Sequence, residues 1–506
     1  MVYSSRSIGK KLIIGSSYYY TSLLINKALT TVSSIFLART LGPTNFGMIA
    51  IVNYLLLLLL FFAGFGIPTA IVKLIPTYWA EDKKEASSFI GSAFFINFLI
   101  IVLITLLYYL LAHDIAWGVY RNEKLGILFQ ISAFTLFFLS LSQYGNSVIQ
   151  ALGEFKLLSF LLIFNSLIGL ILLIPLTKLF GIRGTVLSQS FTALVVFFLL
   201  LNIFQTLRKK HNLFPLWNGF NKLRKHFSKL SFFAFPLFLS GLVMVPALTI
   251  LTTILSRVCG FQEVGFFNIG YSLMQIILFL PTAVGVPFIP LASRLVGEDR
   301  EKLKDFLGKT ISGVNVIVLA LSFLIGFFAR EIIKLFYGSK YEPAQNILLL
   351  LLTAGFLCSF GYIVGYYLLA IGKVWLGTLF NFIWFVVILV LAFPLIKWWG
   401  LVGLGLAYLL SYTILAAIFC FYLKGHLKES IQQVAIQLFV GTGFLYGLFL
   451  MRILIPSIPG KTLHLFKISL PWGLFLLFSL SLIFLIPRTL NRETITKLLK
   501  RRDAEE

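Results

Sequence analysis

The chain alternates long apolar stretches with short polar ones along almost its whole length. A membrane-spanning helix needs about 20 mostly apolar residues, and the stretches, divided at charges, glycines and prolines, give about fourteen such segments. The segments start near residues 12, 46, 88, 125, 157, 183, 231, 264, 306, 343, 375, 401, 431 and 467. The pattern therefore predicts an all-α integral membrane protein with about fourteen transmembrane helices.

Composition excludes several classes of protein. Of the 506 residues, 59% are hydrophobic and only 12% are charged, whereas soluble domains average about 25% charged residues. No room is left for a large soluble catalytic domain. Cys259, Cys358 and Cys420 lie far apart in the chain, so neither a disulfide framework nor a metal cluster is expected.

The net charge of +24 is distributed according to membrane topology. Polar segments on the side of the two termini carry about twice as many Lys and Arg residues as those on the other side, which predicts that both termini are cytoplasmic. We expect a multi-pass protein of the cytoplasmic membrane. Basic inner loops beside anionic lipid headgroups account for most of the charge, so no nucleic-acid partner is needed.

An internal repeat with an offset of about 218 residues is the most informative feature. The segment from Arg39 to Gly42, followed by Phe46-Gly47, corresponds to the segment from Arg257 to Gly260, followed by Val264-Gly265. Further pairs are Gly66 and Pro68 with Gly285 and Pro287, Glu81-Asp82-Lys83 with Glu298-Asp299-Arg300, Phe89-x-Gly91 with Phe306-x-Gly308, Gly153 with Gly372, Pro175 with Pro394, and Gly181-x-x-Gly184 with Gly400-x-x-Gly403.

The repeat unit covers six predicted helices, an even number, so both copies insert with the same orientation. Parallel repeats of this kind are typical of transporters that work by alternating access around a cavity, although a duplicated scaffold without transport would show the same repeat. We predict six-helix bundles over 1–206 and 231–424, two further transmembrane helices over 425–487, and a basic cytoplasmic tail over 488–506. The basic segment 207–230 should form an amphipathic helix on the inner membrane surface; this helix and the tail could instead bind a partner.

Several motifs resemble a known family. The first predicted span ends in Leu37-Ala38-Arg39-Thr40-Leu41-Gly42-Pro43, followed by Phe46-Gly47, Ala63-Gly64-Phe65-Gly66 and Ile75-Pro76. This order is similar to that in the polysaccharide transporters of the multidrug/oligosaccharidyl-lipid/polysaccharide exporter superfamily. The resemblance extends over essentially the whole chain, but the motif says less about which branch of the superfamily is present.

The resemblance implies a flippase. Such a protein moves undecaprenyl- or dolichyl-linked oligosaccharide repeat units from the cytoplasmic to the outer leaflet, for the synthesis of cell-surface polysaccharide or glycoconjugates. Related branches flip the lipid-linked peptidoglycan precursor or expel drugs, and both remain alternatives. The expected partners are the anionic lipid-linked oligosaccharide and membrane lipids, and the basic inner loops leave open a second role in recruiting glycosyltransferases or a polymerase.

The diphosphate of such a substrate is anionic, so we expect positively charged side chains along its path through the membrane. Lys27 lies inside the first predicted span, where a charge is expensive and therefore a candidate functional group; a lysine near a helix end can also snorkel to the interface. Arg39 and Arg257 are paired by the repeat and can hold phosphate with two hydrogen bonds or cap helix ends. Lys73 can bind phosphate on entry, or can simply follow the topology of a basic inner side.

Two polar stripes at helical spacing are candidates for contact with sugar hydroxyls. Asn146, Ser147 and Gln150 follow Gln143 in the fourth span, and Tyr271, Ser272 and Gln275 follow Asn268 in the eighth. The alternative is that these groups join neighbouring helices. The packing explanation is preferred for residues that stand alone, namely Asn53, Asn165, Gln189 and Asn315.

Absent motifs separate the remaining functions. All 18 acidic residues fall in predicted loops or at helix ends, which disfavours an exporter of cationic drugs that relies on a buried acid. The predicted outer loops are short and lack a paired-acid or metal-ligand motif, which disfavours a membrane polymerase or glycosyltransferase. There is also no Gly-x-x-x-x-Gly-Lys loop. We therefore expect a transporter without a cofactor, not an enzyme.

Overall fold

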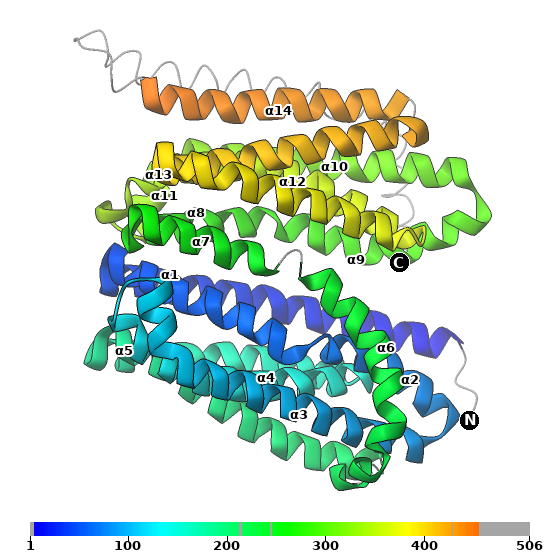
Figure 1. The fold of residues 1–506 in the computed structure, drawn as a ribbon. Coiled ribbons are helices and arrows are strands. Elements are labelled where there is room, and N and C mark those ends of the chain that lie inside the picture. Colours follow the sequence, from blue (N-terminus) through cyan, green and yellow to red (C-terminus); the bar gives the residue numbers. More distant parts are fainter. Residues whose placement is uncertain (1–4, 212–214, 243–244, 428, 455–506) are drawn as a thin grey trace, which may run out of the picture. The chain divides into compact units, whose positions relative to one another are not determined.

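The computed structural model describes residues 5–211, 215–242, 245–427 and 429–454, and all regular elements within these ranges are helices (Figure 1). Nine of the described helices are long and apolar enough to cross a membrane. The prediction of an all-α membrane protein is confirmed. The predicted span that starts near residue 467 and the tail over 488–506 lie outside the described residues, so the count of fourteen stays a prediction.

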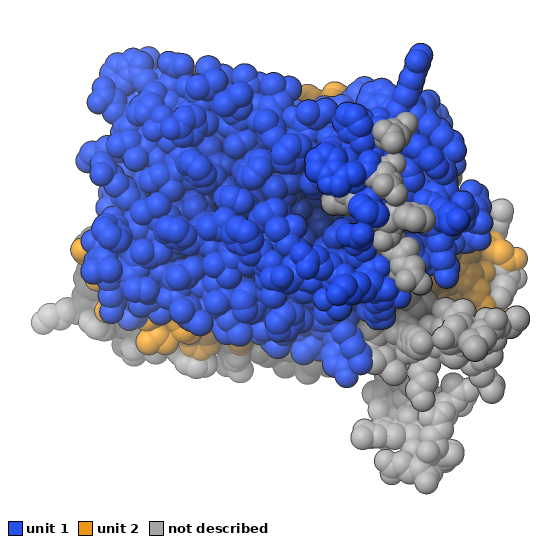
Figure 2. All heavy atoms as spheres, turned by 90° about the horizontal axis from the view of Figure 1, so that it is seen from below, with its two compact units in different colours: residues 1–265 blue, residues 266–506 orange. Residues whose placement is uncertain are grey.

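Unit 1 is the first of two compact units and comprises Met1–Gly265. Its side chains cover most of the face shown in Figure 2. Its elements are α1 (Ser5–Gly64), α2 (Ile67–Glu81), α3 (Lys83–Asp114), the π-helical turn η1 (Ile115–Val119), α4 (Lys124–Ala151), α5 (Phe155–His211), the 3-10 helix η2 (Leu216–Lys222), α6 (Leu223–Gly241), α7 (Val245–Cys259) and the start of α8 (Phe261–Ile277).

Unit 2 comprises Phe266–Glu506. Its described elements are the remainder of α8, then α9 (Phe279–Glu298), α10 (Arg300–Phe327), α11 (Ala329–Phe336), η3 (Ser339–Tyr341), α12 (Ala344–Ala370), α13 (Val374–Leu427) and α14 (Glu429–Leu454). α12 is buried along most of its length, with an apolar side chain at nearly every position. A helix that is apolar on all sides is typical of the centre of a membrane bundle.

Three long helices each contain two of the predicted spans, because a glycine breaks the helical backbone without ending the helix. These breaks lie at Gly42 in α1, Gly181 in α5 and Gly400 in α13. Conversely, the span predicted from residue 231 is divided between α6 and α7.

The local geometry reproduces the sequence repeat. Gly181 has φ 58° and ψ −133°, and its counterpart Gly400 has φ 57° and ψ −129°, a conformation that side chains rarely allow. A Cβ atom on Gly184 would lie 1.8 Å from the carbonyl oxygen of Leu176, just as one on Gly403 would lie 1.9 Å from that of Leu395.

The matched acidic residues also have one structural role. The Asp82 carboxylate accepts a hydrogen bond from the backbone N–H of Lys84 at the start of α3, over 2.8 Å. The Asp299 carboxylate accepts from Glu301 and Lys302 at the start of α10, over 3.0 and 3.1 Å. Both carboxylates cap a helix N-terminus in the same way. The repeat seen in the sequence is therefore also a repeat of local structure.

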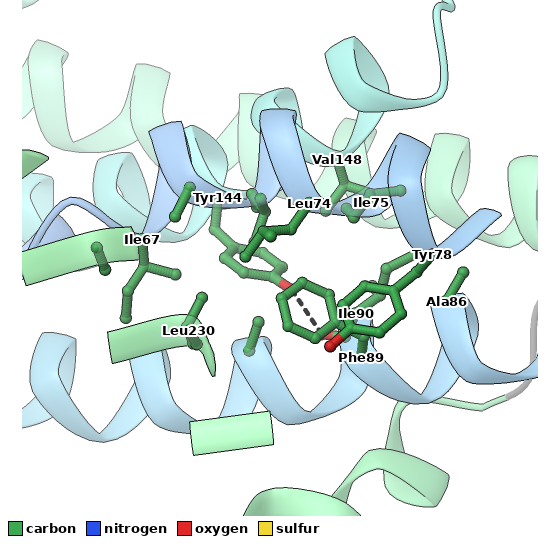
Figure 3. Close-up of a cluster of buried hydrophobic side chains, with 14 residues drawn as sticks. Ile67, Leu74, Ile75, Tyr78, Ala86, Phe89, Ile90, Tyr144, Val148 and Leu230 are labelled. Atoms are coloured by element: carbon green, nitrogen blue, oxygen red, sulfur yellow. Dashed lines mark hydrogen bonds between the residues drawn. The ribbon is translucent and has the colours of Figure 1, made fainter. Parts of the chain in front are cut away.

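A buried cluster joins four helices of unit 1 (Figure 3). Ile71 and Leu74 of α2 pack with Phe89 of α3, and the Tyr144 hydroxyl of α4 donates a hydrogen bond of 2.6 Å to the Ile90 carbonyl. From α6, Leu230 and Ala234 belong to the same cluster. Because α4 is fixed on one side by this cluster, its opposite face is held in a defined position.

The basic segment after α5 also packs on unit 1. Within residues 208–229 the described elements are the end of α5, η2 and the start of α6, in place of one amphipathic helix. Glu85 of α3 forms ion pairs with Lys222 and Lys225 over 2.6 and 2.5 Å and contacts His226 over 3.1 Å. His226 is only 1% exposed, and its Nδ1 lies 2.8 Å from the Ser92 hydroxyl. These contacts fasten the segment to α3.

Candidate functional site

A polar cavity of about 320 Å³ lies within unit 1, between α1, α4 and α5. The amides of its wall come mainly from one face of α4, where Gln143, Asn146 and Gln150 follow one another at helical spacing. The other polar lining residues are Tyr19, Ser142, Ser147 and Asn165, and the rest of the wall is formed by Leu, Ala and Val side chains. The structure thus brings together the three α4 residues predicted to contact substrate.

Two amide oxygens of this wall are buried without a hydrogen-bond partner among the described residues: Gln143 Oε1 and Asn146 Oδ1. The buried Ser142 hydroxyl likewise has no hydrogen-bond partner among the described residues. A buried polar atom without a partner costs about 1–3 kcal/mol, and nearly all such atoms in folded proteins are hydrogen-bonded. The amide and hydroxyl side chains of the wall can hydrogen-bond to a molecule that carries several polar groups.

The lining residues include no charged side chain. Such a wall offers hydrogen bonds but no ion pair, so it suits an uncharged polar group better than a phosphate or an organic cation. Its apolar remainder can contact the C–H faces of a ring.

Of the residues interpreted as packing residues, Asn165 lines the cavity, whereas Asn53 and Gln189 join two helices. Asn165 of α5 lies in the cavity wall, while Gln189 Nε2 of α5 donates a hydrogen bond of 3.1 Å to Asn53 Oδ1 of α1. Tyr19 also lines the cavity, although nothing in its sequence context distinguishes it from Tyr18 and Tyr20. Only the packing of α5 and α1 against α4 reveals these members of the wall.

Lys27 is half-buried in α1 and is not one of the residues that line the cavity. No acidic side chain pairs with it in the part of the chain that the structure describes. The hydroxyls of Thr30 and Thr31 donate to the Lys27 carbonyl over 3.0 and 2.8 Å. The two threonines thus bond to their own helix, and a role for Lys27 towards phosphate stays a prediction.

Of the other predicted cations, Arg257 has the best-defined contacts. Its guanidinium, at the end of α7, donates to the carbonyl oxygens of Gly118 and Val119 in η1. This arrangement supports the structural alternative, in which the arginine satisfies carbonyls at a helix end. Arg39 is exposed near the Gly42 break, and exposed Lys73 places its Nζ 4.6 Å from the centre of the Phe233 ring of α6.

The second predicted stripe lies on α8 in unit 2, where Asn268, Tyr271 and Gln275 are half-buried. Tyr271 and Gln275 are hydrogen-bonded to each other. The Tyr271 ring packs on Phe267 and Tyr408, with centroids 5.5 and 6.5 Å apart. This stripe therefore belongs to an aromatic cluster, and a substrate contact there stays a prediction.

An ionic group lies where the chain turns from α4 into α5. Glu154 contacts Lys210 over 2.5 Å and His211 over 3.0 Å. Burial alone would raise the pKa of Glu154, but the hydrogen bonds from Lys210 and His211 outweigh it, so the pKa is lowered. This group ties the two ends of α5 together close to Gln150.

Comparison with known proteins identifies the class of this chain. The chain is 24% identical over 427 residues to an uncharacterized membrane protein of the cps region of Klebsiella pneumoniae, covering 82% of this chain and 83% of the relative. It is 24% identical over 392 residues to the lipid III flippase of Escherichia coli, covering 76% and 91% of the two chains. A probable low-salt glycan biosynthesis flippase of Haloferax volcanii matches over 34% of this chain and 36% of its own length, again at 24% identity.

Solved structures show the fold. A lipid II flippase in an inward closed conformation aligns with a TM-score of 0.69 and 16% identity, covering 91% of this chain and 97% of that one. An inward-facing multidrug resistance transporter aligns with a TM-score of 0.65 and 15% identity, covering 83% and 98%.

The family model for polysaccharide biosynthesis proteins matches residues 36–346. Together with the transporter fold, this match confirms the resemblance seen in the motifs around Gly42 and Gly47. The chain belongs to the polysaccharide biosynthesis protein family, a branch of the multidrug/oligosaccharidyl-lipid/polysaccharide exporter superfamily, and is a multi-pass membrane transporter.

Proposed function

We propose that this protein moves glycans linked to an isoprenoid diphosphate across the cytoplasmic membrane by alternating access, with both termini in the cytoplasm. The observation that carries the proposal is the uncharged polar cavity of unit 1. On its wall, Gln143, Asn146 and Gln150 place three amide side chains on one face of α4. Sugar hydroxyls and N-acetyl groups can exchange hydrogen bonds with such amides.

The relatives support the same substrate class. Two of them carry names of flippases, one for lipid III and one for a glycan. A drug exporter of the same fold would bind organic cations, and a cavity that lacks carboxylates has little to offer them. The diphosphate needs separate positive groups outside this cavity, and Lys27, Arg39 and Lys73 remain the proposed ones, whereas Arg257 is proposed to have the structural role. Asn268, Tyr271 and Gln275 are proposed sugar contacts in unit 2.

The test uses purified protein in proteoliposomes that contain an isoprenoid-diphosphate oligosaccharide. Exposure of the sugar to an external lectin or glycosidase measures flipping, and dye efflux from the same vesicles measures drug export. We expect protein-dependent exposure of sugar without ion-driven dye efflux. Dye efflux without sugar exposure would refute the proposal.

A matched pair of variants links the activity to the cavity. Gln143→Leu combined with Asn146→Leu removes both amides from the wall. Asn202→Leu removes an exposed amide from α5 that bonds to the Phe198 carbonyl of its own helix. The double variant should lose most of the flipping, while Asn202→Leu should flip at the normal rate. Equal rates for all three proteins would detach the function from this cavity.

A further inference from the structure

A second cavity of unit 1, with a volume of about 210 Å³, lies where three helices end. Its lining residues are Pro76, Trp79 and Ala80 near the end of α2, Ala151 and Leu152 at the end of α4, and His211 at the end of α5. The last carbonyl groups of a helix carry a partial negative charge. The surroundings of this cavity therefore favour a positively charged occupant over an anion.

A carboxylate next to the cavity has an oxygen that is not in use. Lys210 and His211 both contact Oε1 of Glu154, over 2.5 and 3.0 Å. Oε2 has no hydrogen-bond partner among the described residues, and the side chain is 19% exposed. The rings of His211 and Trp79 meet edge to face with their centroids 5.7 Å apart, and an aromatic face attracts an ammonium group. A carboxylate oxygen and two rings are thus available to a small cation.

The sequence repeat shows that unit 2 uses a hydrogen bond at the equivalent place. Ser293 of α9 and Pro76 of α2 are equivalent, because each lies five residues before its matched Glu-Asp pair. The Ser293 hydroxyl donates to the Ala370 carbonyl at the end of α12, over 3.2 Å. Ala151, the counterpart of Ala370, lines the cavity together with Pro76, and a proline has neither a hydroxyl nor an N–H to donate.

The charge at this place also differs between the two copies. Glu154 directly follows Gly153, and its equivalent Lys373 directly follows Gly372. Lys373 bonds to the Tyr422 hydroxyl over 3.5 Å and gives this helix end a positive charge, which the helix dipole favours. Unit 1 has a carboxylate and a cavity where unit 2 has a cation of its own.

A positive group lies close to the cavity as well. Lys83, exposed at the start of α3, places its Nζ 5.8 Å from the centre of the Trp79 ring. It forms no ion pair with the carboxylates of the described ranges. An occupant that carries both a cation and an anion matches these two kinds of group. Tryptophan near a helix end is typical of the membrane surface, where phospholipid headgroups carry such charges.

We propose that this cavity binds the headgroup of an ethanolamine phospholipid, with its ammonium among the helix ends beside Glu154 and its phosphate towards Lys83. A primary ammonium has three N–H donors for carbonyl and carboxylate oxygens, whereas a choline headgroup has no N–H and a glycerol headgroup has no cation. With cytoplasmic termini, as proposed above, the lipid belongs to the inner leaflet. The bound headgroup holds the ends of α2, α4 and α5 together.

The first test measures binding without transport. Native mass spectrometry of the purified protein in detergent follows titration with dioleoyl phosphatidylethanolamine, phosphatidylcholine or phosphatidylglycerol. The ethanolamine lipid should bind about fivefold or more tightly than the other two. Equal affinities, or a preference for phosphatidylglycerol, would overturn the proposal. Free O-phosphoethanolamine at the same concentration should not displace the lipid; displacement would indicate a soluble ligand and overturn the assignment to a lipid.

The second test locates the bound lipid. Pro76→Ser gives unit 1 the residue found at the equivalent place in unit 2, and Glu154→Gln removes the charge that attracts the ammonium; each should weaken binding of the ethanolamine lipid by about fivefold. Pro175→Ser is the matched control, because Pro175 also lies inside a helix, α5, but does not line the cavity; it should bind the lipid normally. If both Pro76→Ser and Glu154→Gln bind the lipid normally, the site lies elsewhere and the proposal fails. None of these outcomes depends on flipping, so the proposed function is tested separately.

Discussion

Replacing Gln143 by leucine should make the protein more stable and less active at the same time. Gln143 Oε1 is buried without a partner among the described residues, and such an atom costs about 1–3 kcal/mol. Leucine has a similar size and removes that cost. The free energy of unfolding should therefore rise by about 1 kcal/mol or more.

The effect on transport has the opposite sign. A neutral hydrogen bond between the amide and the glycan contributes about 1 kcal/mol, which corresponds to about a fivefold weaker interaction. The same loss at Asn146 would give about thirtyfold in the double variant if the two effects add, although residues one helical turn apart can be coupled. The loss should appear in the concentration of lipid-linked glycan needed for half-maximal flipping.

The assay combines the proteoliposome lectin measurement with thermal or denaturant unfolding in detergent. Tyr108→Phe is the control, because the buried Tyr108 hydroxyl has a partner, the Ser132 hydroxyl, at 2.7 Å. This control should lower the free energy of unfolding and leave flipping per folded molecule unchanged. If Gln143→Leu destabilises the protein as the control does, or flips glycan normally, the cavity is a packing feature and the reasoning is refuted.

Three further outcomes are expected. Lys27→Gln should reduce flipping severalfold without reducing the amount of protein in the membrane, because it removes a cation proposed to meet the diphosphate; normal flipping in the lectin assay would remove Lys27 from the path. Arg257→Ala and Arg257→Asp should both lower the free energy of unfolding in detergent by about 1 kcal/mol, because the arginine bonds to neutral carbonyls. A much stronger loss of flipping for Arg257→Asp than for Arg257→Ala would instead indicate phosphate contact. The pKa of Glu154 is lowered in the folded protein, so its pairing with Lys210 and His211 stabilises the fold at pH values above the ordinary pKa of a glutamate. This stabilisation is lost as the pH falls through the lowered pKa. The variant Glu154→Gln should therefore lack this pH dependence of the free energy of unfolding, and an unchanged pH profile would contradict the pairing.

The sequence alone determined the class of fold and the duplication. The length of an apolar stretch needed to cross a membrane is a local property, so most predicted spans coincide with described helices. Gly181 and Gly400 were paired by spacing, and their nearly identical dihedral angles show that the spacing reflects a shared backbone. The stripe from Gln143 to Gln150 was visible for the same reason, because helical periodicity alone places those residues on one face.

Only the tertiary structure decided which polar residues meet. Asn165 and Tyr19 carry no local signal, and they reach the cavity because α5 and α1 pack against α4. The contacts of Arg257 with carbonyls of η1, more than a hundred residues away in the chain, are visible only in the structure. The division of the seventh predicted span into α6 and α7 likewise became visible only in the structure.

The contact of Gly47 with Gly265 shows why the sequence determines some features and the tertiary structure determines others. A Cβ atom on Gly47 would lie 2.9 Å from the backbone nitrogen of Gly265. The repeat makes the two glycines equivalent, but equivalence does not require proximity. Whether equivalent residues touch is set by the angles and distances at which helices cross. Periodicity along one helix is encoded locally, whereas the crossing of two helices is decided by all the side chains between them.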